Sequence, residues 1–258
     1  MPHTASAKNS GYNLTSLGKW WSDKKLSDVT AANCRTYAKG KTPAATRRDL
    51  EMLRAAIGHW HREHGPLPSV PAVVLPPKPA SRDRWLTRCE VARLLWAARR
   101  IPHLRRFILL GFYTGTRSGA LLGLRWDWVK LDAGIMRRRA PGSAEKRNKR
   151  TPDARLGKRI LAHLRRWRRL DGPRCAYVCH YNGQRVTKLR RSWSTAVRNA
   201  GLDSTVTPHT LRHTKATRLM QAGVDAWQAA GYLGMTVEML TRTYGHHHPD
   251  YHRDAAEV

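Results

Sequence analysis

The sequence His209-Thr210-Leu211-Arg212-His213, with Tyr244 further along the chain, does most to decide the fold and the chemistry of this protein. A helix is predicted here, because Thr207 suits the N-cap, Pro208 the first helical position and Gly223 the end. On a helix, the first histidine and the arginine share one face of the first turn, where free N–H groups and the helix dipole favour an anion. We therefore expect a phosphate site, with Tyr244 as a potential nucleophile.

The net charge of the chain limits what it can bind. Its 258 residues include 48 Lys+Arg and 18 Asp+Glu, which gives a formal charge of +30. Such a surplus repels itself unless a polyanion is bound, and the candidates are nucleic acid, an anionic membrane surface or an acidic protein. Nucleic acid is favoured, because the charge is spread through an otherwise globular sequence that contains aromatic residues.

Neither a membrane span nor a signal peptide is expected. The longest strongly apolar run, Phe107–Tyr113, is far shorter than the roughly 20 residues that cross a bilayer, and the N-terminus lacks an apolar core. The four cysteines lack zinc-ribbon spacing, which predicts reduced thiols and a cytoplasmic protein. The cluster Cys175-x3-Cys179-His180 is expected on a strand, and a metal site there is the lesser alternative because no fourth ligand is evident.

Two domains are predicted on either side of a proline-rich stretch. We expect a helical DNA-binding domain over residues 1–75, a linker over 76–84 and a second domain over 85–258. The first domain is predicted to contain helices at Ala31–Ala38 and Pro43–Ile57. The polar face of the second helix carries Arg47, Arg48 and Arg54, which form either a solvated face or, as the overall charge favours, contacts with DNA phosphates.

The second domain is predicted to be mainly helical. Thr87-Arg88-Cys89-Glu90 is a capping box that opens a helix, and Pro102 begins another that ends at Tyr113. From Trp126 to about Leu156 the pattern becomes strand-like, with turn signals between the apolar runs, so we expect about three antiparallel strands. The predicted fold class is therefore mainly α with a small antiparallel β-sheet (α+β).

Two basic features lie in this domain. A turn at Gly115 places Arg117 beside an apolar stretch, where an arginine needs a partner, either a bound anion or a structural salt bridge. Residues 137–174 hold 15 Lys+Arg and three acidic residues, the densest basic stretch in the chain. Within it, Gly157–Leu170 is predicted to form an amphipathic basic helix, a pattern that calmodulin targets and membrane-surface helices share.

Three sequence segments carry a family resemblance. TGTRSGALLGLRW (114–126), PHTLRHTKATRL (208–219) and YLGMTVEMLTRTYGHHH (232–248) resemble the signature boxes of the tyrosine recombinases, or phage integrases, and prophage-type integrases most closely. The resemblance covers about residues 25–258 and implies a helical core-binding domain followed by a catalytic domain. Type IB topoisomerases share the chemistry, but the HxLRH box and the compact helical ending are more similar to an integrase.

The resemblance implies a role for each matching residue. Arg117 and Arg212 would hold the non-bridging oxygens of the scissile phosphate with charge-assisted hydrogen bonds. His209 would assist proton transfer, and Tyr244 would attack phosphorus to form a 3′-phosphotyrosyl link and free a 5′-hydroxyl. Two guanidiniums would supply the charge stabilisation that a divalent ion gives elsewhere, so the resemblance implies no metal and no other cofactor.

The turn of the predicted hairpin is also basic. Lys146 matches the family lysine that protonates the leaving oxygen, although Lys149 is close enough in sequence to be confused with it. Arg147, Lys149 and Arg150 are expected to contact DNA.

The chain departs from the family pattern at two positions. Ala120 replaces a common acidic residue, and Met235 replaces a third catalytic histidine or tryptophan. Methionine cannot donate a hydrogen bond to the phosphate, and loss of one donor costs about 3 kcal/mol of transition-state stabilisation, or about a hundredfold in rate. Tyr251 is the reserve nucleophile, and His246-His247-His248 is not expected to bind a metal, because consecutive side chains point in different directions.

The resemblance implies a homotetramer that acts on paired double-stranded DNA sites, associated with the nucleoid when bound. The region before Trp20 and the segment after Tyr244 look shorter than in the family, which predicts a shortened first domain and weakened assembly. The leading hypothesis is a prophage or mobile-element integrase that integrates or excises DNA. The alternative is a degenerate integrase that is weak or inactive and only binds DNA.

Overall fold

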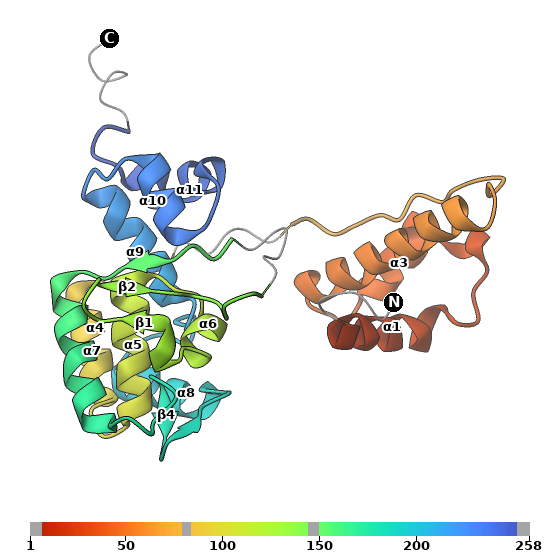
Figure 1. The fold of residues 1–258 in the computed structure, drawn as a ribbon. Helices are drawn as coiled ribbons and strands as arrows, with labels where there is room; N and C mark the ends of the chain where they lie inside the picture. Colours follow the sequence, from red (N-terminus) through yellow and green to blue (C-terminus); the bar gives the residue numbers. More distant parts are fainter. Residues whose placement is uncertain (1–6, 79–83, 144–149, 252–258) are drawn as a thin grey trace, which may run out of the picture. The chain divides into compact units, whose positions relative to one another are not determined.

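The computed structural model describes residues 7–78, 84–143 and 150–251, and it divides the chain into two compact units, Met1–Ser81 and Arg82–Val258 (Figure 1). Each unit has its own buried core, so each is described by itself. Among the described residues, no helix combines the length and the apolar character needed to cross a membrane.

The first unit is a small helical bundle. It consists of α1 (Ala7–Trp21), the short 3₁₀ helix η1 (Leu26–Asp28), α2 (Ala31–Ala38) and α3 (Pro43–Glu63). The side chain of Thr42 caps α3, which continues six residues beyond the predicted end at Ile57. The proline-rich stretch is non-helical, as predicted, but Val73 is buried in the core of this unit and Leu67 and Leu75 pack against it. Residues 67–75 thus belong to the core of the first unit.

The second unit contains eight of the α-helices in the described chain. They are α4 (Arg88–Ala97), α5 (Pro102–Thr114), α6 (Ser118–Leu122), α7 (Lys158–Asp171), α8 (Arg190–Asn199), α9 (Thr210–Gln221), α10 (Ala226–Leu233) and α11 (Val237–Tyr244). The predicted capping box forms at the start of α4, where Thr87 and Glu90 each accept from the other's backbone N–H. Helix α5 lies in the middle of the unit, and its Leu104, Phe107 and Ile108 are almost wholly buried.

Two small antiparallel sheets complete the second unit. The first joins β1 (Val129–Lys130), β2 (Ile135–Met136) and β3 (Ala154–Arg155) in chain order, and the second pairs β4 (His180–Tyr181) with β5 (Gln184–Arg185). Met136 pairs with Val129 on one side and with Ala154 on the other, and all three are buried. The fold is therefore mainly α with small antiparallel sheets, as predicted.

Two predicted boundaries are wrong. Helix α9 begins at Thr210 rather than Pro208, because a preceding turn is closed by bonds from Thr210 N–H to Thr207 O and from Thr207 N–H to the Thr210 hydroxyl. This turn leaves His209 at the N-cap. The segment Cys175–His180 is not a continuous strand: Tyr177 makes one isolated bridge with Arg125, and β4 begins at His180.

Candidate active site

Two left-handed glycine turns bring the site together. Helix α5 ends at Gly115 (φ +63°) and α10 ends at Gly234 (φ +66°). A Cβ atom at Gly115 would lie 2.6 Å from Leu233 Cδ2, and one at Gly234 would lie 2.5 Å from the carbonyl oxygen of Arg150. Both positions therefore require glycine for its backbone conformation and for the close packing of the two turns.

The carbonyls of these turns hold the two arginines that the sequence singles out. Arg117 donates to the carbonyl oxygens of Arg150 (2.7 Å) and Gly234 (3.0 Å), and Arg212 donates to that of Gly115 (3.0 Å). Within the described residues neither forms a salt bridge with a carboxylate, so the salt-bridge alternative for Arg117 is not realised there. A guanidinium has five N–H donors, so both arginines keep donors and charge for an anion.

A third arginine, Arg138, supports both turns and was missed in the sequence. It is 5% exposed and follows β2, from which it donates to the carbonyl oxygens of Thr114 (3.0 Å) and Tyr232. Burial, with a contribution from the charge of Arg117, lowers the pKa of Arg138 to about 10. Burial followed by the charges of Arg117 and Arg138 likewise lowers the pKa of Arg212 to about 10. Three positive charges thus gather where they repel one another, which favours an anion between them.

Tyr244 ends α11, and its hydroxyl points into this group. The side chain is 5% exposed, and its oxygen lies 2.6 Å from Nδ1 of His213. Its oxygen is also close enough to Arg212 to stabilise the charge of that guanidinium. The histidine in hydrogen-bonding contact with the tyrosine is therefore His213, to which the sequence analysis assigned no role. The reserve tyrosine, Tyr251, is half exposed and lies against Gly245.

His209 lies beside His213 at the mouth of the site. The two rings meet edge to face, with centroids 4.8 Å apart. Although part of the His209 ring is exposed, its burial and the charges of His213, Arg212 and Arg117 lower its pKa to about 4. At neutral pH the ring is therefore uncharged and offers one N–H donor.

Comparison with known proteins identifies the family. The family model described as "Phage integrase family" matches residues 84–250, more than half of the chain. The chain belongs to the phage integrase family of tyrosine recombinases. Among its relatives, tyrosine recombinase XerA of Thermococcus kodakarensis is 33% identical over 209 residues, which cover 77% of this chain and 71% of the relative. Tyrosine recombinase XerD of Lacticaseibacillus casei is 26% identical over 250 residues, which cover 91% and 85%.

Solved integrase structures share the fold. The Tn1549 transposon integrase in complex with a circular intermediate DNA has a TM-score of 0.76 at 17% identity, with 99% of this chain and 94% of that chain covered. A dimer of lambda integrase bound to a COC′ core site has a TM-score of 0.74 at 20% identity, with 91% and 89% covered. The family makes this chain a recombinase that acts on DNA at specific sites.

Some of the other residues that the sequence singled out lie outside the described part of the chain, and the structure places the rest. Lys146, Arg147 and Lys149 lie outside the described residues. Arg150 is exposed, and Met235 lies beside it in a cavity of about 470 Å³ whose edge includes Gly234. Met235 thus lies next to the carbonyls that hold Arg117, and Ala120 is half buried on α6.

The predicted DNA-binding arginines of the first unit differ in whether their side chains already bond to other residues. Arg47 pairs with Glu51 (2.9 Å) and donates to the Pro76 carbonyl (2.6 Å), so it ties the proline-rich stretch to α3. Arg48 is exposed and donates to the Ala44 carbonyl of its own helix. Arg54 is exposed and forms no bond to another described residue.

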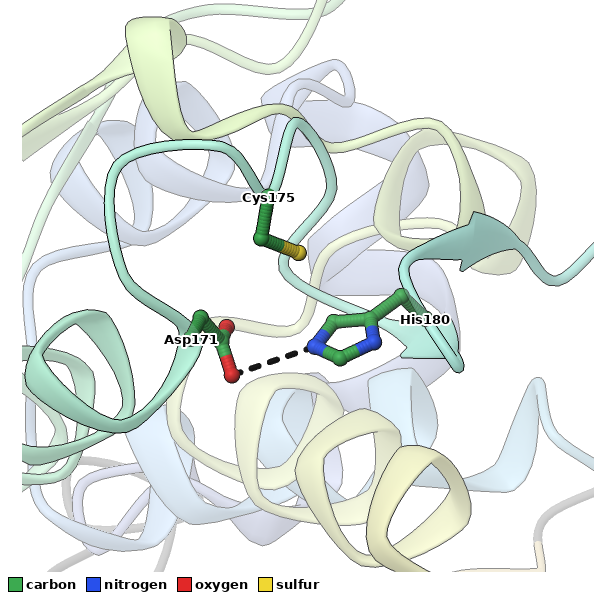
Figure 2. Close-up of side chains that lie close together, drawn as sticks. All are labelled: Asp171, Cys175 and His180. Carbon is green, nitrogen blue, oxygen red and sulfur yellow. Dashed lines mark ion pairs between the residues drawn. The ribbon is translucent and has the colours of Figure 1, made fainter.

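A cluster of metal-ligating residue types lies apart from this site. Figure 2 shows Asp171, Cys175 and His180, whose ligand atoms lie within 4.8 Å of one another. The predicted member Cys179 is not part of it, and burial in the core raises the pKa of that thiol to about 12. Among the residues that the structure describes, no other such cluster was found.

The ligand atoms of this cluster already have internal partners. Arg106 donates to both carboxylate oxygens of Asp171 (2.7 Å each), and Trp126 Nε1 donates to one of them (3.0 Å). His180 accepts a backbone hydrogen bond at Nδ1, and its Nε2 lies 3.1 Å from Asp171. Cys175 donates to a backbone carbonyl. The cluster therefore acts as a buried ion-pair network that joins α5, α7 and β4.

Proposed function

We propose that this recombinase is catalytically active and that it cuts and rejoins DNA through Tyr244. The observation that carries the proposal is the contact between the buried Tyr244 hydroxyl and His213 Nδ1 (2.6 Å), beside an arginine with unused donors. A phenol is a weak nucleophile at neutral pH until a neighbouring base accepts its proton. His213 is at the right distance to be that base.

The proposed step is a transesterification. The Tyr244 oxygen attacks the scissile phosphorus and a P–O bond forms, while the bond to the 5′ oxygen breaks and the phenolic proton passes to His213. The charge that develops on the phosphoryl oxygens faces Arg117 and Arg212. The leaving 5′ oxygen takes a proton from Lys146, the role that the family resemblance implies for that residue. Religation reverses each transfer, and the phosphotyrosyl bond conserves the energy for it.

His209 has a different role in this proposal from that of His213. With a pKa of about 4 it is neutral when the enzyme works, so it donates one hydrogen bond to a phosphoryl oxygen and does not act as a strong base. Met235 supplies no such donor, so the chemistry is slower than with a histidine or tryptophan at that position.

We further propose that the reaction integrates or excises a prophage or another mobile element, with four copies acting on paired DNA duplexes at the nucleoid. Two similar structures support the mobile-element context: one is a transposon integrase with circular intermediate DNA, and another is lambda integrase on a core site. The tetramer rests on the family resemblance alone. The formal charge of +30 supports a polyanionic partner.

A suicide substrate tests the proposal. A duplex from the junction of the element is nicked close to the cleavage position, so that the released fragment diffuses away and the covalent product accumulates. We expect an adduct with the intact protein and none with Tyr244→Phe, whereas Tyr251→Phe, the matched control, forms it normally. DNA binding without any adduct from the intact protein would support the degenerate, DNA-binding alternative.

A further inference from the structure

The apolar side of α7 is closed, which excludes two of the partners that its sequence pattern allows. Ile160, Leu164 and Trp167 are 1%, 0% and 7% exposed and belong to the core of the second unit. A membrane-surface helix inserts its apolar face into lipid, and a calmodulin target inserts it into the calmodulin groove. Neither can happen here without unfolding the unit, so only the outer, charged side of α7 is available to a partner.

That outer side belongs to a larger basic face. We define the basic face by six arginines: Arg88 on α4, Arg105 on α5, Arg159, Arg166 and Arg169 on α7, and Arg218 on α9. All are exposed except Arg218, which is partly buried. Within the described residues none of the six forms an ion pair with a carboxylate, and α7 has no acidic residue before Asp171, which is buried and paired with Arg106.

The charges of the basic face converge in two places. Near the C-terminal half of α7, Arg105 and Arg166 line a hollow of about 140 Å³ with His163 and Trp167. Burial, followed by the charges of these two arginines, lowers the pKa of His163. Like charges that face one another across a hollow destabilise the free protein, and a bound anion relieves the repulsion.

The second group lies at the other end of α7. Arg218 stacks on the Phe112 ring, with its guanidinium carbon 4.7 Å from the ring centre, which fixes its position. Burial lowers the pKa of Arg218, and the charges of Arg88 and Arg159 lower it further. Three arginines from three helices thus lie close enough at this end for their charges to act on one another.

The α7 part of the basic face is separate from the candidate active site. Arg117 caps α6, and Figure 1 shows α7 along the edge of the second unit that lies away from α6. Helix α7 has 14 residues and is therefore about 21 Å long. A DNA duplex carries one negative charge per about 1.7 Å, so it offers about a dozen phosphates over that length.

We propose that the basic face is a second, sequence-independent binding surface for duplex DNA, which holds a DNA segment other than the one at the catalytic site. The protein can then join two duplexes without requiring a second catalytic site for the contact. The inference does not depend on the proposed covalent chemistry, because phosphate contacts alone supply this kind of affinity.

A bridging assay tests this inference. One duplex of unrelated sequence is fixed to beads, and capture of a second, fluorescent duplex is measured with the full-length protein and again in the Tyr244→Phe background. The test variant is Arg159→Gln/Arg166→Gln/Arg169→Gln on α7. The control removes three exposed arginines from α8, as Arg190→Gln/Arg191→Gln/Arg198→Gln. Circular dichroism and thermal melting confirm that both variants fold.

The expected result is that the α7 variant loses bridging by at least about tenfold and still binds the fixed duplex, while the α8 control bridges normally. Each phosphate contact contributes about 0.9 to the slope of log affinity against log salt, so three lost contacts lower the slope for the second duplex by about 2.7. Bridging that survives in the α7 variant would overturn the inference, because assembly of catalytic sites would then explain it. Capture of phosphatidylserine vesicles without capture of a second duplex would overturn it in favour of a membrane surface.

Discussion

Arg106 and Arg212 are both buried arginines of the second unit, but they are satisfied in opposite ways. Arg106 forms a two-point ion pair with Asp171, whose carboxylate also accepts from Trp126. Although burial acts to raise it, the hydrogen bonds from Arg106 and His180 hold the pKa of Asp171 below its usual value. Arg212 donates to the carbonyl of Gly115 and forms no ion pair with a described carboxylate.

The difference shows that the fold neutralises an arginine that stabilises the structure and leaves charged an arginine that lies near Tyr244. A carboxylate cancels the charge of Arg106, whereas a carbonyl fixes the position of Arg212 and leaves its charge intact. The same holds for Arg117 and Arg138, which also donate to backbone carbonyls. Three guanidiniums that form no ion pair with a described carboxylate thus act on one another near Tyr244, an arrangement that favours a bound anion.

The largest expected effect comes from removing an uncancelled charge. In the proposed mechanism Arg212 is a charged donor to the scissile phosphate, so we expect Arg212→Ala to slow adduct formation by about a thousandfold. Single-turnover kinetics on the nicked substrate measure this. A change of less than about tenfold would place Arg212 outside the chemistry.

Removing Arg106, whose charge is paired with Asp171, is expected to lower stability. Arg106→Ala leaves Asp171 buried without its main partner, which should lower the free energy of unfolding by about 3–5 kcal/mol, as seen in urea melts. Arg125→Ala, which breaks the exposed pair with Asp127, is the control and should cost at most about 1 kcal/mol. Equal losses in the two variants would contradict the structural role of the Asp171 network.

Adding a hydrogen-bond donor at position 235 should raise the rate of adduct formation. Met235→His places a hydrogen-bond donor beside Gly234, and we expect adduct formation to become faster by up to about a hundredfold with little change in stability. Ala120→Glu serves as a comparison, because that position is on α6 and is the other departure from the family pattern. No gain from Met235→His would mean that the position does not face the phosphate.

A substitution at Gly234 should disturb the backbone carbonyls that accept hydrogen bonds from Arg117. A Cβ there would meet the Arg150 carbonyl at 2.5 Å, so Gly234→Ala should displace the acceptors of Arg117 and cost about 2 kcal/mol in stability as well as cleavage rate. Gly223→Ala is matched in φ (+66°) but has nothing within 4 Å of the added Cβ. Gly223→Ala should therefore lose stability only through backbone strain, and it should cleave DNA at the normal rate.

The smallest expected effect is on pH dependence. His209 has a folded-state pKa of about 4, below its ordinary value of 6.5, so the unfolded chain binds more protons between these values. The free energy of unfolding should therefore fall as pH drops from 6.5 towards 4. In His209→Gln this dependence on pH should be weaker, and the difference should correspond to less than one proton taken up on unfolding, because the ring is partly exposed. An unchanged slope would mean that the ring is not desolvated.

The sequence predicts the helices of the second unit well where chemistry marks their ends. Thr87 and Glu90 form the expected capping box, Pro102 begins α5, and Gly223 follows α9. The start of α9 was predicted two residues early, because Thr207 looks like an N-cap but its backbone bonds with Thr210 close a separate turn. Local signals identify the residue types of a cap and not which of two overlapping turns forms.

The site is predictable to the extent that it follows from single residues. Arg117, Arg212 and Tyr244 were predicted as site residues, and their roles stay predictions. The contact between Tyr244 and His213 was not predicted, because it depends on how α11 packs against α9. Arg138 was missed within a run of three arginines. The sequence signal that could have found it is spacing, because residues two apart in extended chain share one side, and Arg138 comes two residues after the apolar Met136 of β2.

The most direct test of the central claim is to measure unfolding free energy and adduct formation side by side in Arg212→Ala and Arg106→Ala. We predict that Arg212→Ala loses about a thousandfold in rate with a stability change of about 1 kcal/mol, while Arg106→Ala loses stability and, at a temperature where it stays folded, cleaves within about tenfold of the intact protein. Losses of rate and stability that run in parallel in both variants would contradict the separation of structural from chemical charge.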